Sequence, residues 1–463
     1  MFFEASAAAE NGRIGVSLAT PQSVGKLQSA LGAKAEAEPA FRFYQLWDKV
    51  WRKDVLAFAY AKSRANKGAA GVDGQSFADI ESYGVERWLG ELAEELRTKR
   101  YVPQAVRRVG IAKEAGGSRP LGIPTIRDRV VQTALLLVLG PIFEGDLMPE
   151  QYAYREGRSA LDAVKAVNQH VYGGLSDVVD ADLKGYFDSI PHGELMTCVA
   201  RRIVDREVLR VVKSYLEVAV EEEVESGGIV RTTANRDEGR GTPQGSPLSP
   251  FLSNLYMRRF ILGWKVLGHA ERLGAVIVNY ADDFAICSKG NAQASLDAMR
   301  GMMSKLKLTV NVSKTRTCDA KRESFEFLGY RFGPHYSWKY RKFYTGFAPS
   351  KRKVGTLCRK LSFKTSKQAT VASEADKVAE LNRVLRGWRN YFSLGSLAGA
   401  YDAVMKHARR RLGEWLRKKR GGELRGEASR HPKEYWHGTM NLIDLQELRK
   451  QKAKGVCSAK ETR

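Results

Sequence analysis

The spacing of hydrophobic and polar residues predicts helices near both ends of the chain, with strands and helices alternating between them. Residues 1–38 are rich in Ala, Gly and Ser and are expected to be poorly ordered. Two stretches then carry apolar residues at every third or fourth position, which is the period of an amphipathic helix. The first stretch has Tyr44, Trp47, Trp51, Val55 and Phe58, and the second has Val85, Trp88, Leu89, Leu92 and Leu96.

The centre of the chain alternates between strand and helix patterns. The expected elements are two short strands around a glycine turn at 106–125, a helix at 126–144 that Pro141 ends, a buried strand turning into a helix at 176–190, a loop and an apolar helix at 241–264, a hairpin around 276–286, and strand-like stretches at 306–315 and 325–333. From about residue 347 onward the chain is expected to be helical and basic.

Two adjacent carboxylates interrupt the hairpin pattern in the stretch VNYADDFAI, residues 278–286. Apolar and polar positions alternate up to Asp282 and Asp283, which leaves little loop in which to solvate them. Aspartate is a common turn residue, so one interpretation is an ordinary polar turn. The other is a cation site, because two neighbouring carboxylates repel each other unless a cation lies between them.

Composition favours a polyanionic partner. The 463 residues include 76 Lys and Arg against 52 Asp and Glu, a formal charge of +24. Such an excess indicates nucleic acid more than an anionic membrane, although a basic protein with no such partner is an alternative. The five cysteines are scattered, with no CxxC pair, and the longest apolar run is too short to span a bilayer. No secretory signal is recognised at the N-terminus, so a soluble intracellular protein is expected.

A third acidic position lies 100 residues before the pair. Val178 and Val179 lead into Asp180, Ala181 and Asp182, which places Asp182 at the end of a buried strand. Three carboxylates at one end of a sheet can hold two Mg²⁺ ions, which prefer a few carboxylates together with substrate phosphates. Two such ions activate a primer 3′-hydroxyl and stabilise a leaving pyrophosphate.

Taken in order, the motifs resemble those of the reverse transcriptases, or maturases, encoded by group II introns. They are KEAGGSRPLGIPTIRDR, YAYREGRSALDAV, DADLKGYFD, GTPQGSPLSP, YADD, VSKT, FLGYRF and LNRVLRGWRNYF, and they cover residues 41–420. The resemblance implies an α+β, right-hand polymerase with fingers, a palm built on an antiparallel sheet and a helical thumb. It also implies that Asp182, Asp282 and Asp283 are the metal ligands, and that Ala281 leaves room for a primer terminus.

Other positions take their roles from the same resemblance. Lys113 and Arg119 are similar to the cations that grip the incoming triphosphate, Gln244 to the contact with nucleotide and template, and Lys314 to the lysine that protonates pyrophosphate. For each of them a solvated surface position is the alternative. FLGYRF resembles a primer grip, although a core strand would look the same. Ala112 departs from the usual proline of the family, and GSPLSP departs from the GGVISP of many members.

Phe187, five residues after Asp182, bears on which nucleotide is used. A phenyl ring offers no acceptor to a ribose 2′-hydroxyl and fills the space, so it is expected to exclude ribonucleotides. Core packing beside Tyr186 is the alternative interpretation.

The C-terminal third is strongly basic, with 21 Lys and Arg against 5 Asp and Glu in residues 341–420. One predicted helical face carries Val378, Leu381, Val384, Leu385, Trp388, Tyr391 and Phe392, and another carries Arg383, Arg386 and Arg389. We expect the arginine face, together with Lys351, Arg352 and Lys353, to bind RNA, with a solvated face as the alternative. The tail shows no paired cysteines and no His-Asn-His arrangement, so an endonuclease domain is not expected.

These patterns predict the following domains: a poorly ordered segment at 1–38, an N-terminal extension and fingers at 39–175, a palm at 176–345, a basic thumb and maturase region at 346–420, and a basic tail at 421–463. By the resemblance, the protein is an RNA-directed DNA polymerase that binds its group II intron RNA, assists its splicing and copies it into cDNA during retrohoming. The implied partners are the intron RNA, an RNA template with a DNA primer, target DNA and dNTPs, in a bacterial cytoplasm and at the nucleoid when DNA is bound. Two alternatives stay open: a maturase that only assists splicing, and a reverse transcriptase of phage defence or of a CRISPR-associated system.

Overall fold

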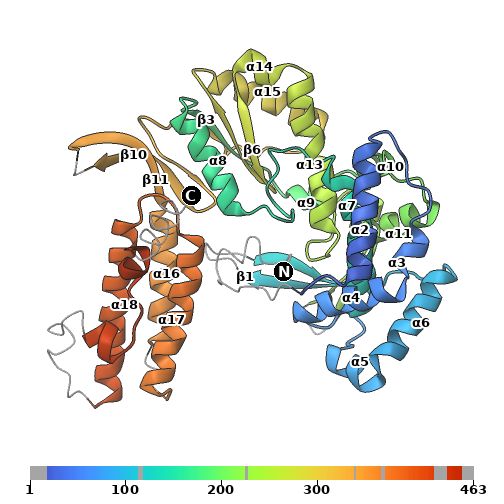
Figure 1. Ribbon diagram of the computed structural model, residues 1–463, viewed down its shortest axis with the longest axis horizontal. Coiled ribbons are helices and arrows are strands. Elements are labelled where there is room, and N and C mark those ends of the chain that lie inside the picture. The colour runs from blue at the N-terminus through green and yellow to red at the C-terminus, as the bar shows by residue number, and fades with distance from the viewer. Residues whose placement is uncertain are drawn as a thin grey trace. The chain divides into compact units, whose positions relative to one another are not determined.

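The computed structural model describes residues 18–112, 118–224, 228–337, 340–366, 371–421 and 435–450 (Figure 1). Its contacts divide the chain into two compact units. Among the described residues, the first unit holds 18–163 and 181–317, and the second holds 164–180 and 318–450. Asp182, Asp282 and Asp283 therefore belong to the first unit, and the basic helices belong to the second.

The described residues contain both many helices and three sheets with antiparallel hairpins, which is consistent with the expected α+β class. The helices are α2 (Gln22–Ala37), α3 (Trp47–Val50), α4 (Lys53–Ala65), α5 (Phe77–Tyr83), α6 (Val85–Arg97), α7 (Ile126–Glu144), α8 (Ala160–Tyr172), α9 (Tyr186–Ser189), α10 (His192–Ala200), α11 (Arg206–Leu216), α12 (Ala234–Asp237), α13 (Ser249–Val266), α14 (His269–Leu273), α15 (Ala292–Lys305), α16 (Lys351–Lys364), α17 (Glu374–Tyr391), α18 (Ala398–Lys419) and the π-helical turn η2 (Tyr435–Thr439). The strands are β1 (Val106–Ala112), β2 (Ser118–Ile123), β3 (Asp177–Asp182), β4 (Val220–Glu223), β5 (Ile229–Thr232), β6 (Val276–Tyr280), β7 (Asp283–Ser288), β8 (Arg316–Asp319), β9 (Phe325–Phe327), β10 (Tyr330–Ser337) and β11 (Lys342–Pro349).

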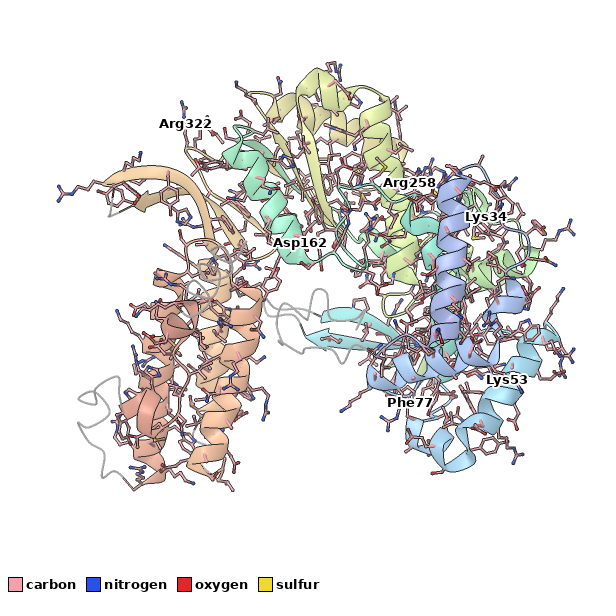
Figure 2. All side chains as sticks on the ribbon, viewed as in Figure 1. Lys34, Lys53, Phe77, Asp162, Arg258 and Arg322 are labelled. Carbon is pink, nitrogen blue, oxygen red and sulfur yellow. The ribbon has the colours of Figure 1, made fainter. Side chains whose placement is uncertain are left out.

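Helix α7 is the centre of the first unit. Fourteen of its 19 residues are buried, so neighbours surround it on nearly every side. Helices α2 and α4 pack against it. Helix α13 is also largely buried, and its Arg258, labelled in Figure 2, donates from Nε to the carbonyl oxygen of Asp146 at 2.5 Å. Phe260 of α13 packs against Phe284 of β7 with ring centroids 5.5 Å apart, so α13 supports a strand of the site.

Two expectations about α7 and its surroundings are wrong, and one contact explains both. Pro141 does not end the helix, which continues to Glu144. Because proline has no N–H, the carbonyl oxygen of Leu137 loses its helical partner, but it accepts a hydrogen bond from Nε2 of Gln28 at 3.2 Å. Gln28 lies in α2, so residues 22–37 form a packed helix and not a poorly ordered segment. Residues 1–17 lie outside the described residues.

The expected helix at residues 44–58 is two helices, α3 and α4, with a break at Trp51 and Arg52. Arg52 is extended (φ −57°, ψ 137°), and its guanidinium pairs with Asp54 at 2.7 Å. Asp205 accepts hydrogen bonds from the backbone N–H of Leu46 and of Trp47, at 2.8 and 2.9 Å. Because of these bonds α3 begins at Trp47, and Tyr44 lies outside it. The regular spacing of apolar residues from Tyr44 to Phe58 therefore did not correspond to one continuous helix. The expected second helix is confirmed as α6.

Two four-stranded sheets carry the predicted site. The first has the order β2-β1-β4-β5, and its β1–β2 hairpin is antiparallel, as expected. The second has the order β6-β7-β3-β8, with β6 and β7 antiparallel. The boundary between the two units falls within β3, just before Ala181. The central strand β7 therefore has the hairpin strand β6 on one side and β3 on the other.

Residues 306–315 do not form the strand that their alternation predicted. Val310 makes a single bridge to Leu183, and the chain then turns at Asn311. The carbonyl oxygen of Asn311 accepts from the N–H groups of Lys314 and Thr315, which closes the turn. The next strand, β8, begins only at Arg316.

The second unit combines a three-stranded sheet, of order β11-β10-β9, with helices α16, α17 and α18. The stretch 325–333 contains parts of two strands, β9 and β10, joined by a turn in which Leu328 has φ 49°. Tyr330 of β10 donates to the carbonyl oxygen of Tyr391 at 2.7 Å, and Tyr391 donates to the carbonyl oxygen of Leu328 at 2.8 Å. These reciprocal bonds fix α17 to the β9–β10 turn.

Candidate active site

The turn between β6 and β7 presents the paired carboxylates. Tyr280 and Asp283 are cross-strand partners, so only Ala281 and Asp282 lie between the strands. Ala281 has φ 56°, a left-handed conformation that costs an alanine about 1–2 kcal/mol. Its carbonyl oxygen accepts from Nδ2 of Asn279 at 2.8 Å, and Asn279 is fully buried. A buried side chain in β6 therefore holds a tight turn that has no glycine of its own.

Asp182 is the last residue of β3, and the turn at Asn311 binds both its side chain and its backbone. Its Oδ2 atom accepts from Nδ2 of Asn311 at 2.8 Å and from Nζ of Lys314 at 3.1 Å. The carbonyl oxygen of Asp182 accepts from the N–H of Asn311 at 2.9 Å. The buried residues Val178, Val179 and Ala181 precede it, as the sequence predicted. Both the backbone and one carboxylate oxygen of Asp182 are thereby fixed.

The sheet order relates Asp182 to the paired carboxylates. Asp182 is the last residue of β3 and Asp283 is the first of β7, and these two strands are neighbours. The charge of Asp282 also reaches Tyr186, four residues after Asp182. Burial raises the pKa of Tyr186 well above its ordinary value, and the nearby Tyr256 and Asp282 raise it further. The two acidic motifs therefore share one region of the first unit.

The donor groups of this region are suited in kind to a hard divalent cation. Asp182, Asp282 and Asp283 are half-buried carboxylates, and carboxylate oxygens are the side-chain ligands that Mg²⁺ prefers. Within the described residues, no group of three or more Asp, Glu, His or Cys side chains is already gathered as a metal cage. Oδ2 of Asp182 is bonded to Lys314 and Asn311, so ion binding at that atom requires Lys314 to move.

The loop that carries Gln244 joins the strand β2 to the segment after β3. The N–H of Thr242 donates to the carbonyl oxygen of Phe187 at 2.7 Å. The N–H of Gly122 donates to the carbonyl oxygen of Gln244 at 2.5 Å. A Cβ atom at position 122 would meet Val106 at 2.5 Å, so this approach requires glycine. The backbone of Gln244 is thus set by contacts on both sides.

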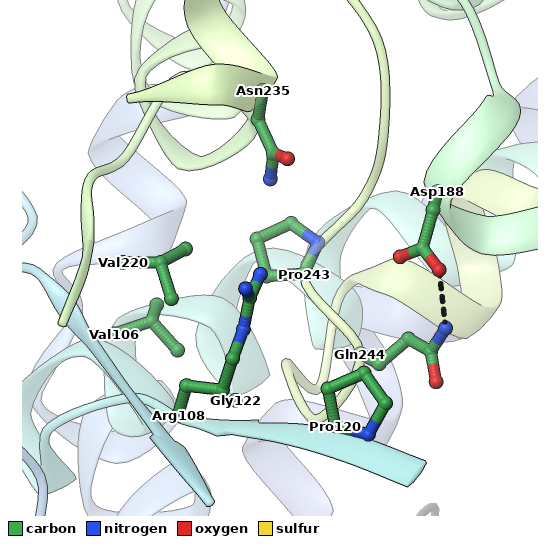
Figure 3. A pocket seen from close by; sticks show the side chains of 9 residues that line it. All are labelled: Val106, Arg108, Pro120, Gly122, Asp188, Val220, Asn235, Pro243 and Gln244. Atoms are coloured by element: carbon green, nitrogen blue, oxygen red, sulfur yellow. Dashed lines mark hydrogen bonds between the residues drawn. The ribbon is translucent and has the colours of Figure 1, made fainter. Parts of the chain in front are cut away.

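The side chain of Gln244 borders a small pocket, shown in Figure 3. Nε2 of Gln244 donates to Oδ2 of Asp188 at 3.0 Å, which fixes one end of its carboxamide. The residues that line the pocket are Val106, Arg108, Pro120, Gly122, Asp188, Val220, Asn235, Pro243 and Gln244. Four of these residues, Arg108, Asp188, Asn235 and Gln244, are polar or charged, so the pocket can offer hydrogen bonds to a group that enters it.

Phe187 is buried beside Tyr186, with ring centroids 5.7 Å apart in an edge-to-face arrangement. The hydroxyl of Tyr186 donates to the carbonyl oxygen of Ser253 at 2.6 Å, which anchors α9 on α13. Both the steric gate and the core-packing interpretations remain compatible with this position. The gate therefore stays a prediction.

Lys113 and Arg119 are the cations expected on the fingers hairpin. The β1–β2 hairpin is as predicted, with Ile111 paired to Arg119 through the backbone. Lys113 and the side chain of Arg119 lie outside the described residues. Their contact with a triphosphate stays a prediction.

Helix α17 separates an apolar face from a basic one, as predicted. Val378, Leu381, Leu385 and Trp388 are buried, while Arg383 and Arg386 are exposed. Arg389 differs from the other two arginines because it is half-buried and donates from Nη2 to the carbonyl oxygen of Leu448 at 3.1 Å. The exposed part of the basic face is therefore narrower than expected.

Helix α16 begins with three cations and has no acidic residue in its first turn. Ser350 caps it by accepting from the N–H of Lys353. Lys351 and Arg352 are exposed, and Arg352 lies 3.4 Å from Glu326. Cations are unfavourable at the positive end of a helix dipole, so these three residues do not stabilise the helix. Binding of an anionic partner would explain their position.

Two residues that contact the site were missed by sequence reasoning. Asn311 holds Asp182, and Asp188 holds Gln244. Asn311 comes directly before the VSKT motif, three residues before Lys314, and Asp188 is the last residue of the DADLKGYFD motif, directly after Phe187. A polar residue within three positions of a proposed site residue was the available signal.

Two protein families match the chain. Residues 111–332 match the family described as "Reverse transcriptase (RNA-dependent DNA polymerase)". Residues 356–436 match "Group II intron, maturase-specific domain". The matched region of the first family contains all three aspartates, and that of the second contains α17. In the part of the chain that the structure describes, no helix is long and apolar enough to cross a membrane.

Several curated proteins are similar in sequence. "Protein YkfC" of Escherichia coli K12 is 31% identical over 350 residues, which cover 66% of this chain and 88% of YkfC. "Group II intron-encoded protein LtrA" of Lactococcus lactis is 30% identical over 228 residues, which cover 48% of this chain but only 36% of LtrA. "Nuclear intron maturase 2, mitochondrial" of Arabidopsis thaliana is 30% identical over 94 residues, or 20% of this chain and 13% of that protein. The α+β structure and these matches are consistent with the expected right-hand polymerase fold.

Proposed function

The chain belongs to the family of reverse transcriptases and maturases encoded by group II introns, and we propose that Asp182, Asp282 and Asp283 form its polymerase centre. The observation that supports this assignment most strongly is that Asp182 ends the strand next to the one that Asp283 begins. The three carboxylates would hold two Mg²⁺ ions. When bound, such ions activate the primer 3′-hydroxyl and stabilise the leaving pyrophosphate.

The other side chains bind and orient the nucleotide in this proposal. Gln244, fixed by Asp188, contacts the incoming dNTP and the template base. Phe187 excludes a ribose 2′-hydroxyl. Lys314 moves away from Asp182 and then gives a proton to the pyrophosphate. Lys113 and Arg119 grip the triphosphate.

We further propose that the protein binds its group II intron RNA, assists its splicing and copies it into cDNA at target DNA during retrohoming. The match of residues 356–436 to the maturase-specific domain supports the RNA partner, as do the exposed cations of α16 and α17. Lys351, Arg352, Lys353, Arg383, Arg386 and Arg389 would contact RNA phosphates, with a smaller share for Arg389. This work would take place in a bacterial cytoplasm, and at the nucleoid when DNA is bound.

The test separates chemistry from binding. Asp282→Ala and Asp283→Ala should each lower Mg²⁺-dependent primer extension by about 10³-fold or more, because metal ions supply several kcal/mol to such transition states. Binding of intron RNA should change little, because these side chains hold metal and not RNA. Asp297→Ala is the matched control, since it removes an exposed carboxylate from α15. Extension at the wild-type rate in either variant would refute the assignment, and intact splicing with no extension in the wild-type protein would favour a splicing-only maturase.

A further inference from the structure

One face of the β10–β11 hairpin carries a row of aromatic side chains. Phe332 pairs with Phe347, and Tyr336 pairs with Phe343, in the antiparallel register. Because side chains alternate between faces along a strand, these two pairs lie on the same face of the hairpin. Near its base the row is part of the core, where Phe332 is buried and stacks on Phe347 with centroids 5.3 Å apart.

The outer half of the same row is open to solvent. Tyr336 is 40% exposed and Phe343 is 73% exposed, and their rings meet edge to face at 5.2 Å. Tyr340, in the connection between the strands, is 64% exposed. Figure 1 shows this end of the hairpin extending away from α16, α17 and α18. An apolar face that continues from a core into solvent indicates a surface for a binding partner.

The opposite face of the hairpin is anchored within the second unit. His335 pairs with Tyr344, and their rings lie 5.8 Å apart. The hydroxyl of Tyr344 is 2.8 Å from that of Ser396, in the segment after α17. This contact fixes the hairpin on one side and leaves the Tyr336–Phe343 face turned the other way.

Charge identifies the kind of partner. Residues 330–349 contain four Lys or Arg and no Asp or Glu. Arg341 and Lys342 are exposed beside the aromatic pair, and the cations that begin α16 follow directly after β11. Exposed aromatic rings with neighbouring cations are the features by which proteins hold single-stranded nucleic acid, since bases stack on the rings and phosphates meet the cations.

We propose that the outer half of the β10–β11 hairpin binds an unpaired segment of RNA, with bases stacked on Tyr336 and Phe343 and phosphates next to Arg341 and Lys342. This inference rests on the proposed RNA-binding function and adds a place where single strands are distinguished from duplexes. A duplex keeps its bases stacked on one another, so its bases cannot reach these rings.

The experiment measures binding of the full chain to a labelled single-stranded RNA of about 12 nucleotides and to a duplex of equal length. The double variant Tyr336→Ala with Phe343→Ala should weaken single-strand binding by about 30-fold or more, since each stacked base contributes a factor of about 5 to 150. Duplex binding should change less than threefold. The control is Tyr172→Ala with Phe363→Ala, which removes two other aromatic side chains, 85% and 79% exposed, from the same unit.

A second double variant tests whether the loss of affinity comes from unfolding of the hairpin. Tyr336→Leu with Phe343→Leu keeps an apolar pair across the strands but removes the flat rings, so it should preserve the melting temperature and still lose single-strand affinity. The salt dependence separates the two kinds of contact. The aromatic variants should lower affinity equally at all salt concentrations, whereas Arg341→Ala with Lys342→Ala should lower the slope by about 0.7 for each lost phosphate contact.

Equal weakening in the aromatic and control variants would refute the proposal, as would equal loss for single strand and duplex. A change in sedimentation with unchanged RNA binding would refute it in favour of a protein–protein surface. Primer extension on a pre-annealed template serves as the separate readout. If the wild-type protein extends primers and binds RNA, and the hairpin variants bind RNA equally well, only the hairpin proposal is refuted. If the wild-type protein binds no RNA, the proposed function itself is refuted.

Discussion

Lys314 lies against Asp182, with its Nζ atom 3.1 Å from Oδ2 of the carboxylate. Asn311 donates to the same oxygen at 2.8 Å, so one amide and one ammonium group share it. The side chain of Lys314 is 66% exposed, and its attraction to Asp182 is therefore screened by solvent and worth no more than about 1 kcal/mol. A cation this close both neutralises Asp182 and competes with a metal ion for it.

Replacing Lys314 with methionine should affect metal binding and chemistry in opposite directions. The Mg²⁺ concentration for half-maximal extension should fall by about two- to fivefold, because a competing charge worth up to about 1 kcal/mol is removed. The maximal rate should fall by about 10²-fold if Lys314 protonates pyrophosphate, which is the usual contribution of a general acid. A Mg²⁺ titration of single-nucleotide insertion measures both quantities.

Lys307→Met is the matched control for that experiment. Lys307 is also exposed, but it pairs with Glu194 at 2.5 Å and not with an aspartate of the site. It should leave both the Mg²⁺ dependence and the rate unchanged. A Lys314 variant with the wild-type maximal rate would show that Lys314 is only a counter-ion of Asp182.

The hydrogen bond from Gln244 to Asp188 predicts that the two residues act as one unit. Gln244→Ala and Asp188→Ala should each raise the KM for dNTP by about tenfold, the value of one charge-assisted hydrogen bond, with little change in kcat. The double variant should be no worse than either single variant, because the carboxamide has no function once it is free to rotate. Steady-state kinetics of the four proteins give the coupling.

Asn235→Ala is the control for that cycle, since Asn235 lines the same pocket on the side away from the bond (Figure 3). It should raise the KM for dNTP by less than threefold. Additive effects of the Asp188 and Gln244 changes would show that the bond does not position Gln244.

Phe187 is buried, and this position changes how its proposed role is tested. Truncation to alanine would cost about 3–5 kcal/mol of stability, so Phe187→Val is the better variant. It should raise insertion of ribonucleotides relative to deoxyribonucleotides by about tenfold or more, because a steric barrier worth a few kcal/mol is removed. Tyr186→Phe, which loses the bond to Ser253, should lower stability without changing that ratio. Equal ratios in the two variants would mean that Phe187 is a core residue.

The features of this site that were predictable from sequence are local ones. The apolar residues before Asp182 placed it at the end of a strand, and the alternation around Asp282 and Asp283 placed that pair at the tip of a hairpin, because each pattern is contained in a few consecutive residues. The same alternation failed at residues 306–315. There the side chain of Asn311 bonds to Asp182, 129 residues earlier in the chain, and the backbone turns where a strand was expected.

The predicted end of helix α7 was wrong for the same reason. Proline normally ends a helix because a carbonyl group loses its partner, but Gln28 supplies that partner from 109 residues away in sequence. The segment that contains Gln28 was judged from its composition alone. Contacts between distant segments, which no local pattern contains, therefore account for both errors.

The arginines of α17 are expected to differ in their contribution to RNA binding. Arg383 and Arg386 are exposed, so changing both to alanine should remove up to two phosphate contacts. The slope of log affinity against log salt should then fall by about 1.8 on duplex RNA, or about 1.4 on single strands, from counterion release. The loss should be similar for all RNA sequences, because phosphate contacts do not read bases.

Arg389→Ala should behave differently, because its guanidinium donates to the carbonyl oxygen of Leu448. We expect a smaller change in the salt slope and a loss of about 1 kcal/mol in the free energy of unfolding, the value of one hydrogen bond. Arg322→Ala is the control for lost charge, since that side chain is 86% exposed and lies outside α17 (Figure 2). Salt-dependent binding to the intron RNA and extension on a short primer–template at low salt are measured in parallel. If the Arg383 and Arg386 changes leave the salt slope unaltered, the basic face of α17 is a solvated surface, and if extension falls in step with RNA binding, it belongs to the polymerase grip.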